Sequence, residues 1–398
     1  MDLDLTPRLR DFRDEVRTWL AEHLVGEFAE HRGVGFAWDD AAWDVRLAWD
    51  KELAAGGWLC IGWPKEYGGR GASVDEQLIF QLEYARAEAP YRATVQGQDL
   101  LGPTLLAFGS DEQKRRFLPR ITAVEEVWAQ GFSEPGAGSD LASLRTKAVR
   151  DGDEWVIDGH KIWTSFAAHA DWIYVLCRTN PSAQRHRGIS LLLVPMHQPG
   201  VTVRPIANML GGSDFCEVFF NGARTSANMV VGAPDQGWQV AMGALGTERG
   251  TTLLAEHLRM QHEVDRIIDA ARATGQHTRA VMRVELARAW SDAQIIEWNG
   301  RRLLNALKTN TGNPAVQASV SKVFASAAHN RIGQLGMRAR GASSELIGDG
   351  YRLDRLQQVM LASCAESIYG GTTQIQLNLL GERALGLPRE PRVRPEST

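Results

Sequence analysis

The stretch Glu154–Ser165, EWVIDGHKIWTS, decides the fold class because its pattern is extended, in a region where helical spacing has ended from about Gln130. It reads as two extended runs on either side of Asp158 and Gly159. This Asp-Gly pair predicts a hairpin turn, since glycine tolerates the positive φ that such turns need. Further extended runs follow at short intervals, and the β pattern lasts from about Gln130 to Val231. We therefore predict a compact all-β region in the middle of the chain.

The segments on both sides of this region have helical spacing. In the N-terminal part, apolar residues recur every three or four positions from Leu9 to Leu20, which predicts a helix with one buried face. Ser110 is predicted to cap a later helix, and Pro119 is predicted to end it. Helical spacing returns after Gly237. The order helical, β, helical predicts an α+β architecture in three consecutive parts.

The composition is that of an ordinary globular protein of 398 residues. A net charge of -4 gives no electrostatic case for binding nucleic acid or an anionic membrane. No apolar run approaches the ~20 residues that span a bilayer, and the charged N-terminus is unlike a signal peptide. The cysteines are scattered singly without a C-x-x-C pair, so we expect reduced thiols, no metal site and a cytoplasmic protein.

The most informative motif is GFSEPGAGSD, residues 131–140, which lies where the β pattern begins. Glycines interleaved with serine and proline leave backbone N–H groups accessible to a phosphate or to the edge of a flat ring. The alternative is a tight turn between domains. The spacing is not G-x-G-x-x-G and no βαβ unit surrounds it, so a Rossmann site is disfavoured.

Three motifs together give a resemblance to a known family. SEPGAGSD, DGHKIWTS and the C-terminal IYGGTTQIQ resemble the flavin-dependent acyl-CoA dehydrogenases, and GWPKEYGGRG and GSDEQKRRFLP are similar to two further family segments. The match covers nearly the whole chain in the right order. It implies a β-barrel or sandwich in the middle and a four-helix bundle at the C-terminus. The domains we expect are 1–126, 127–233 and 234–388, followed by a tail at 389–398.

The resemblance implies FAD as cofactor and an acyl-CoA thioester as substrate. By position in the motifs, the FAD contacts would be Phe132, Ser133, Gly138, Ser139, Trp163, Ser165, Thr372 and Gln374. The substrate contacts would be Ser139, Arg249, Tyr369 and Gly370. Two alternatives stay open from the residues alone: Trp163 as a filler of a small β core, and Thr372 with Gln374 as a polar turn.

The implied reaction is α,β-desaturation, in which a carboxylate takes the α-proton and the β-hydrogen leaves as hydride to flavin N5. The commonest base of the family lies directly after the tyrosine of the C-terminal signature, where this chain has Gly370. A minority of the family has the glutamate on a helix of the C-terminal domain, and Glu248 occupies that place. The alternative for Glu248 is a solvated ion pair with Arg249. Glu366, one helical turn before Gly370, is a reserve candidate.

Two segments depart from the homotetrameric members of the family. The Arg-x-x-Phe-Gly element is missing, and in GQLGMRARG, residues 333–341, Met337 replaces a glycine of the turn that cradles a neighbour's FAD. This combination resembles bacterial α2β2 heterotetramers built from two homologous chains, which act on bulky acyl groups including steroid side-chain thioesters. The implied partners are a homologous subunit, or further copies in a homotetramer, and an electron-transferring flavoprotein. An oxidase on the same fold and a non-catalytic supporting subunit are the alternatives.

Overall fold

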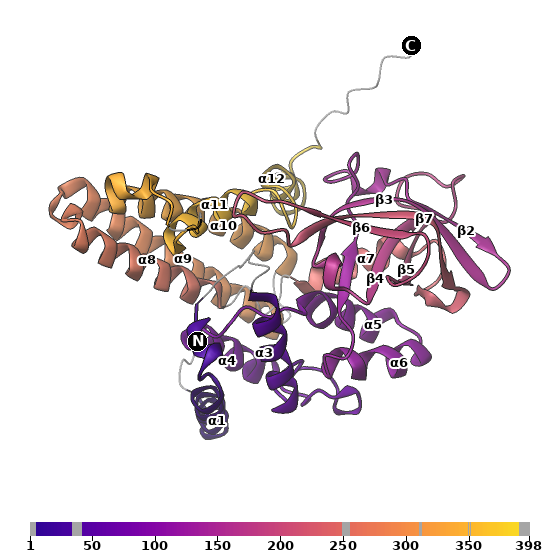
Figure 1. Cartoon of the computed structure of the whole chain (residues 1–398), viewed down its shortest axis with the longest axis horizontal. Coiled ribbons are helices and arrows are strands. Elements are labelled where there is room, and N and C mark those ends of the chain that lie inside the picture. The colour runs from indigo at the N-terminus through magenta and orange to yellow at the C-terminus, as the bar shows by residue number, and fades with distance from the viewer. Residues whose placement is uncertain are drawn as a thin grey trace, which may run out of the picture. The chain divides into compact units, whose positions relative to one another are not determined.

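The computed structural model describes residues 5–33, 42–248, 255–309, 313–348, 350 and 352–389. The chain divides into two compact units, Met1–Thr252 and Leu253–Thr398 (Figure 1). The predicted order of helical, β and helical segments is confirmed.

Side-chain caps set the starts of some of the helices in the first unit. Thr6 accepts from the backbone N–H of Leu9, and Ser73 and Ser110 each form a capping box. The helices are α1 (Pro7–His23), α2 (Glu27–Glu30), α3 (Trp43–Ala55), α4 (Val74–Arg86), α5 (Gly102–Phe108), α6 (Asp111–Thr122) and α7 (Gly237–Glu248).

The prediction that Ser110 caps a helix is confirmed, but the prediction that Pro119 ends it is wrong. Helix α6 passes through Pro119 and ends at Thr122. A proline removes one backbone hydrogen bond. Phe117, Leu118 and Ile121 on either side of it are fully or almost fully buried, so packing of this apolar face holds the last turn.

The strands of the first unit form one mixed sheet of eight strands. Along the sheet the order is β6-β7-β3-β2-β4-β5-β8, with β1 paired to β4. β1 and β2 run parallel to β4, and the remaining pairs are antiparallel. The strands are β1 (Trp128–Gly131), β2 (Lys147–Asp151), β3 (Glu154–Ser165), β4 (Trp172–Arg178), β5 (Ile189–Pro195), β6 (Val201–Ile206), β7 (Phe215–Ser226) and β8 (Val230–Val231).

The predicted hairpin at Asp158 and Gly159 is wrong, because both residues lie inside the continuous strand β3. The chain turns earlier, between β2 and β3, at Gly152, whose φ is +58°. A register shift between β3 and β7 occurs at Asp158 instead. A Cβ at Gly159 would lie 2.6 Å from Thr146 Cα, so the glycine is needed for a close approach of two backbones and not for a turn.

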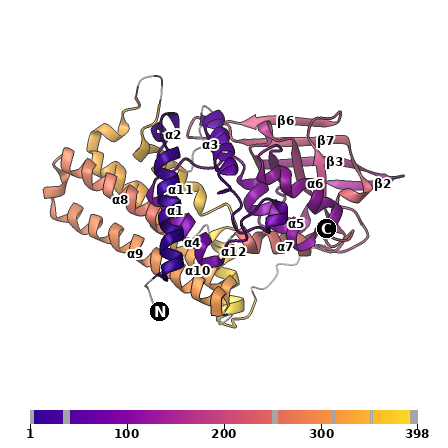
Figure 2. The ribbon, with the colours of Figure 1, turned by 90° about the horizontal axis from the view of Figure 1, so that it is seen from below.

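The helices and the sheet of the first unit share one apolar core. Leu105 of α5 and Phe117 of α6 pack in the same cluster as Leu191 of β5 and Val240 of α7. Figure 2 shows α5, α6 and α7 beside the strands. The N-terminal helices and the β region therefore stabilise each other.

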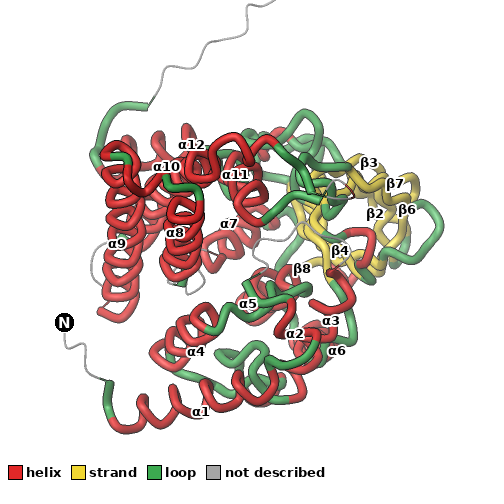
Figure 3. Tube along the Cα trace, turned by 60° about the vertical axis from the view of Figure 1, so that its left-hand side comes forward, coloured by secondary structure: helices red, strands yellow, loops and turns green. Residues whose placement is uncertain are grey.

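The second unit is helical and contains α8 (Glu256–Ala273), α9 (Ala280–Thr309), α10 (Pro314–Arg340), α11 (Arg355–Glu366) and α12 (Thr373–Leu379) (Figure 3). Its core includes Val264, Ile296 and Ile332, one from each of the three long helices. α10 and α11 approach closely at Gly333, where a Cβ would lie 2.8 Å from Met360 Cα. Among the described residues no helix is both long and apolar enough to cross a bilayer, and all four cysteines are free thiols.

Candidate functional site

A buried ion pair shapes the loop that begins at Phe132. Lys161 Nζ lies 2.8 Å from Glu134 Oε1 and donates to the carbonyl oxygen of Phe132 at 3.1 Å. The backbone N–H groups of Arg145 and Thr146 donate to the same carboxylate at 2.6 and 2.8 Å. One carboxylate therefore ties the start of the loop to the segment before β2 and to the middle of β3.

Burial and charge oppose each other in this pair. Burial alone would raise the pKa of Glu134, but the Lys161 ammonium and the hydrogen bonds outweigh it and the pKa is lowered. Burial lowers the pKa of Lys161, and Glu134 opposes that shift. Removing either partner would leave an uncompensated charge with almost no exposure to water, which costs several kcal/mol, roughly 3–5. The loop is thus held in one conformation by the first unit itself.

The outer part of the same loop is open. Gly136 and Gly138 are exposed, and a Cβ at either position would meet nothing within 4 Å. The Ser139 hydroxyl is exposed beside them. A cavity of about 360 Å³ lies against the loop and is lined by Glu134, Pro135, Gly136, Ser143, Arg145, Thr146, Gly159 and His160. Backbone N–H groups next to an arginine suit an anionic group such as a phosphate.

Trp163 lies at an irregular position of β3. Its φ is +60°, a left-handed value that is rare for a bulky residue, and its side chain is 58% exposed. The indole packs edge-on against Phe215 at 6.0 Å between ring centroids. Trp163 therefore does not fill the β core. The neighbouring Ile162 N–H donates to the carbonyl oxygen of Ser133, which brings the start of the loop beside this strand, and Ser165 ends the strand half-buried.

These residues fit the predicted contacts with FAD in the first unit. An exposed indole offers a flat apolar face to an isoalloxazine ring. The open glycines and Ser139 offer donors without side-chain bulk to a pyrophosphate. Phe132 itself is buried and packs edge-on against Tyr174, so it can contribute only backbone groups to a ligand.

In the second unit, the segment after α11 forms a turn without a carboxylate. Gly370 has φ of +63° and is exposed, and Tyr369 before it is 37% exposed. Lys322 Nζ, from α10, donates to the carbonyl oxygen of Glu366 at 2.7 Å and lies 4.5 Å from the centroid of the Tyr369 ring. A Cβ at Gly370 would lie 3.8 Å from the same ammonium nitrogen.

The residues that follow hold this turn from its other side. Thr372 caps α12, and its hydroxyl accepts from the backbone N–H of Ile375 at 3.2 Å. Gln376 is buried and its amide donates to the carbonyl oxygen of Gly370 at 3.2 Å. Gln374 is exposed. The capping bond accounts for Thr372 structurally, and the FAD contacts of Thr372 and Gln374 remain predictions.

Glu366, the reserve candidate for the base, belongs to a buried charge cluster. His329 lies between two carboxylates, with Nδ1 2.7 Å from Glu366 Oε1 and Nε2 2.8 Å from Glu263 Oε2. Arg259 lies 3.5 Å from Glu366. Burial alone would raise the pKa of Glu366, but His329 and Arg259 outweigh it and the pKa is lowered. A carboxylate held in its charged form in this way is a weak proton acceptor.

Glu248 is the last residue of α7, so its backbone position is known, while its side chain and the whole of Arg249 lie outside the described residues. The candidate residues thus form two groups. The first unit carries Phe132, Ser133, Gly138, Ser139, Trp163 and Ser165, with Ser133 next to Ile162 of β3, and the second unit carries Tyr369, Gly370, Thr372 and Gln374.

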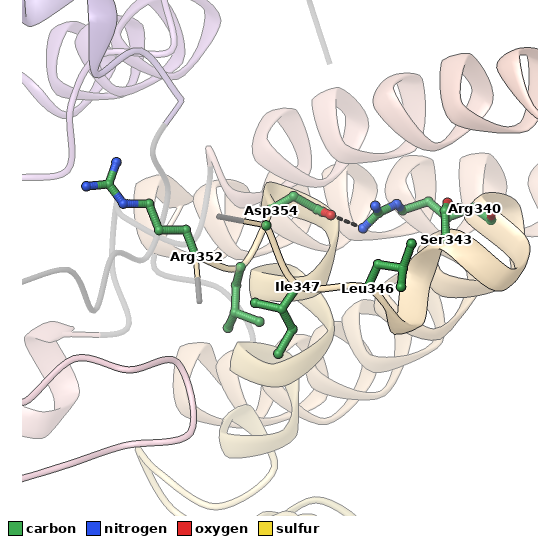
Figure 4. Close-up of a pocket in the computed structure, with 8 residues that line it drawn as sticks. Arg340, Ser343, Leu346, Ile347, Arg352 and Asp354 are labelled. Atoms are coloured by element: carbon green, nitrogen blue, oxygen red, sulfur yellow. Dashed lines mark hydrogen bonds and ion pairs between the residues drawn. The ribbon is translucent and has the colours of Figure 1, made fainter. Parts of the chain in front are cut away.

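The segment Gly333–Gly341 is helical up to Arg340 and forms no glycine-rich turn. Gly333 and Gly336 are buried and contact neighbouring helices, and Met337 packs against the core of the second unit. Arg340 forms an ion pair with Asp354 at the rim of a cavity of about 420 Å³ (Figure 4). This cavity is lined by Arg340, Ser343, Leu346, Ile347, Gly348, Arg352, Leu353 and Asp354.

Sequence reasoning missed Lys161 and Lys322. Lys161 interrupts the apolar positions that face the core of β3, and such a lysine is ordinarily assigned to solvent. Lys322 lies close to Gly370 although it is 48 positions earlier in the chain, and a local sequence pattern cannot predict a contact between residues so far apart. The glycine at 370 was the signal in the sequence that pointed to this position.

Comparison with known proteins finds matches to one family along nearly the whole chain. Family models for the acyl-CoA dehydrogenase N-terminal, middle and C-terminal domains match residues 6–125, 129–223 and 235–385. The acyl-CoA dehydrogenase IpdE1 of Mycobacterium tuberculosis is 46% identical over 387 residues, which cover 96% of this chain and 98% of the relative.

Two solved structures of two-chain proteins are similar in fold. The Tcur3481-Tcur3483 steroid ACAD superposes with a TM-score of 0.86 at 31% identity, covering 98% of this chain and 100% of that one. The ChsE4-ChsE5 complex from Mycobacterium tuberculosis superposes with a TM-score of 0.80 at 33% identity, again covering 98% and 100%.

Proposed function

Because the chain belongs to the acyl-CoA dehydrogenase family, we propose that it removes the α-proton and the β-hydrogen of a bulky acyl-CoA with Glu248 as the proton acceptor. FAD, when bound, accepts the β-hydrogen as hydride. The residues of the first unit that would hold FAD are Phe132 and Ser133 through their backbone, Gly138, Ser139, Trp163 and Ser165. Thr372 and Gln374 would hold it from the second unit.

One observation supports Glu248 more than any other: neither of the other candidate positions can supply a base. Residue 370 has no side chain, and Glu366 is buried between His329 and Arg259 with a lowered pKa. Glu248, at the end of α7, is the remaining candidate. A general base contributes about 10²–10⁴-fold to a rate, so its removal has a large effect.

The other residues orient the substrate and stabilise charge. When the α C–H bond breaks, the proton goes to the carboxylate and negative charge develops on the thioester oxygen. The backbone N–H of Gly370 is the donor that we assign to this oxygen, and donors aimed at a developing charge are typically worth several kcal/mol, about 3–4. The positive φ of Gly370 sets the direction of that N–H.

The test is Glu248→Gln in the complete assembly. We expect bound FAD in the normal amount and a loss of acyl-CoA turnover of roughly 10³-fold or more, because the amide cannot accept the α-proton. The matched control is Glu366→Gln, which should lower thermal stability without a specific loss of proton abstraction in the folded fraction. Near-normal turnover by Glu248→Gln would identify the chain as a supporting subunit with its chemistry elsewhere.

The assembly that we propose is a heterotetramer with a homologous chain. The two similar solved structures are named as pairs of chains, and the segment that would cradle a neighbour's FAD belongs to helix α10 and includes Met337. The word steroid in the name of one of them supports a ring-bearing or branched acyl group as substrate. An electron-transferring flavoprotein is the acceptor that we expect.

A further inference from the structure

The position that a side chain at residue 370 would occupy lies against a cation. A Cβ built on Gly370 would be 3.8 Å from Lys322 Nζ and 3.9 Å from Lys322 Cε. In the proposed function, a side chain at this position would project toward the α-carbon of the substrate. On the proposed function, the Lys322 ammonium would therefore lie near the reacting end of the acyl group, next to the residue whose N–H would meet the thioester oxygen.

This ammonium is held in place by the protein. It donates to the carbonyl oxygen of Glu366 at 2.7 Å and lies over the Tyr369 ring, with its nitrogen 4.5 Å from the centroid. A contact with the last carbonyl of α11 is favourable for a cation because carbonyl groups give the C-terminal end of a helix partial negative charge. An aromatic face adds a further attraction for a cation. The charge is thus fixed before a substrate arrives.

We infer that Lys322 stabilises the negative charge that develops on the thioester oxygen when the α-proton is removed. This inference rests on the proposed function. In the step concerned, the α C–H bond breaks and its proton goes to the base carboxylate. The electron pair forms the C–C double bond of the enolate, and the carbonyl electron pair moves onto the thioester oxygen. A fixed ammonium next to that oxygen, in a half-buried site, favours the enolate more than it favours the neutral thioester.

The charge of Lys322 can be tested separately from its part in holding the end of α11. The carbonyl oxygen of Glu366 has a second donor, the Ser326 hydroxyl at 3.1 Å. Lys322→Met removes the charge and leaves this second bond to hold the end of α11. Ser326→Ala removes the second bond and leaves the charge. The two variants therefore test the two roles in turn, and Lys322→Arg retains the charge.

The experiment uses the holoenzyme with its partner and a 3-oxoacyl-CoA, an analogue that ionises to an enolate with its own absorbance. Its acyl chain is that of the thioester that the wild type turns over fastest in a panel of straight-chain, branched and steroid side-chain acyl-CoAs. We expect Lys322→Met to raise the pKa of the bound analogue by about two units, a 10²-fold change in the equilibrium. Turnover should fall by about the same factor, with KM changed little.

The controls decide between the outcomes. Ser326→Ala should leave the pKa of the bound analogue unchanged, and Lys322→Arg should keep most of the stabilisation. An unchanged pKa in Lys322→Met overturns the inference. Equal shifts in Lys322→Met and Ser326→Ala also overturn it, because the effect would then come from the position of the turn. A wild-type enzyme that turns over no member of the panel would instead remove the proposed function, and this inference with it.

Discussion

Gly370 stands where the resemblance to the acyl-CoA dehydrogenases places the commonest base of that family. With no side chain at 370, the turn keeps a backbone N–H but has no proton acceptor. The structure adds that the vacant space adjoins the Lys322 ammonium. A carboxylate placed there would be paired with a cation at contact distance, and such pairing lowers the pKa of a carboxyl group. We therefore expect that a glutamate introduced at position 370 does not act as a base.

The residue-scale prediction is that Gly370→Glu fails to rescue Glu248→Gln. The new carboxylate pairs with Lys322, and the left-handed backbone costs any other residue about 1–2 kcal/mol. Turnover of the double variant should stay within about tenfold of the Glu248→Gln parent, less than the 10²–10⁴ that a working general base contributes. Gly370→Gln in the same background is the neutral control, and a Glu variant far more active than the Gln variant would contradict the prediction.

At the scale of elements, the second unit depends on a polar junction between three helices. α8 contributes Arg259 and Glu263, α10 contributes His329 and α11 contributes Glu366. Burial alone would lower the pKa of His329, but the two carboxylates outweigh it and raise the pKa to about 10. Burial alone would raise the pKa of Glu263, but His329 outweighs it and lowers the pKa to about 2. The junction therefore ties α10 to both neighbours through charges.

This junction gives a pH-dependent stability. The contribution of His329 is fully present below its ordinary pKa of about 6.5 and is lost as the pH rises toward about 10. The contribution of Glu263 is present above its ordinary pKa and is lost as the pH falls toward about 2. His329→Gln should lower the free energy of unfolding at pH 6 by about 3–5 kcal/mol, because two buried carboxylates lose their partner.

Thermal unfolding measured from pH 6 to 10 checks this prediction. The difference in the free energy of unfolding between the wild type and His329→Gln should shrink as the pH rises. The wild type then loses the stabilisation from protonated His329, which the variant lacks at every pH. Asp292→Asn, which removes an ion pair with the exposed Arg331 on α10, is the control and should change stability less, because one partner remains in water. A difference that is constant with pH would show that the imidazole acts by packing alone.

Elements were more predictable from the sequence than the contacts between them. The cap at Ser110 and the switch to strands follow local rules, and the structure has them. The hairpin assigned to Gly159 was wrong because the same Asp-Gly signal also occurs where a strand meets another backbone closely. His329 and Lys322 could not be assigned from sequence, since their partners lie on other helices and a lone charge on a helix ordinarily faces solvent.

At the scale of the molecule, α9 leaves a row of apolar side chains exposed. Val281, Val284, Ile295 and Trp298 fall on one side of the helix, and Trp298 is 67% exposed. Val281 with Val284 and Ile295 with Trp298 form two apolar pairs that exposed Arg288 and Ser291 separate along the helix, and exposed apolar patches mark interaction surfaces. These pairs support an assembly in which another chain covers this side of α9.

We predict that the chain purified alone holds FAD at well below one per protomer and that co-expression with its homologous partner brings the ratio near one. Absorbance and light scattering measure the ratio and the mass. Trp298→Glu should reduce association with the partner without lowering the melting temperature, because exposed positions contribute little to folding. Val149→Glu, an equally exposed apolar position on β2, is the control. A homomer with stoichiometric FAD would contradict the prediction.

The ion pair of Glu134 and Lys161 bears on why the subunit without its partner would retain FAD poorly. Its members all come from the first unit, so the loop that we propose for the FAD phosphates does not need another chain to take its shape. Weak cofactor retention by the isolated subunit would then reflect a faster escape of FAD and not a collapsed cradle. The amide protons of Arg145 and Thr146 should accordingly exchange with solvent equally slowly with and without the flavin.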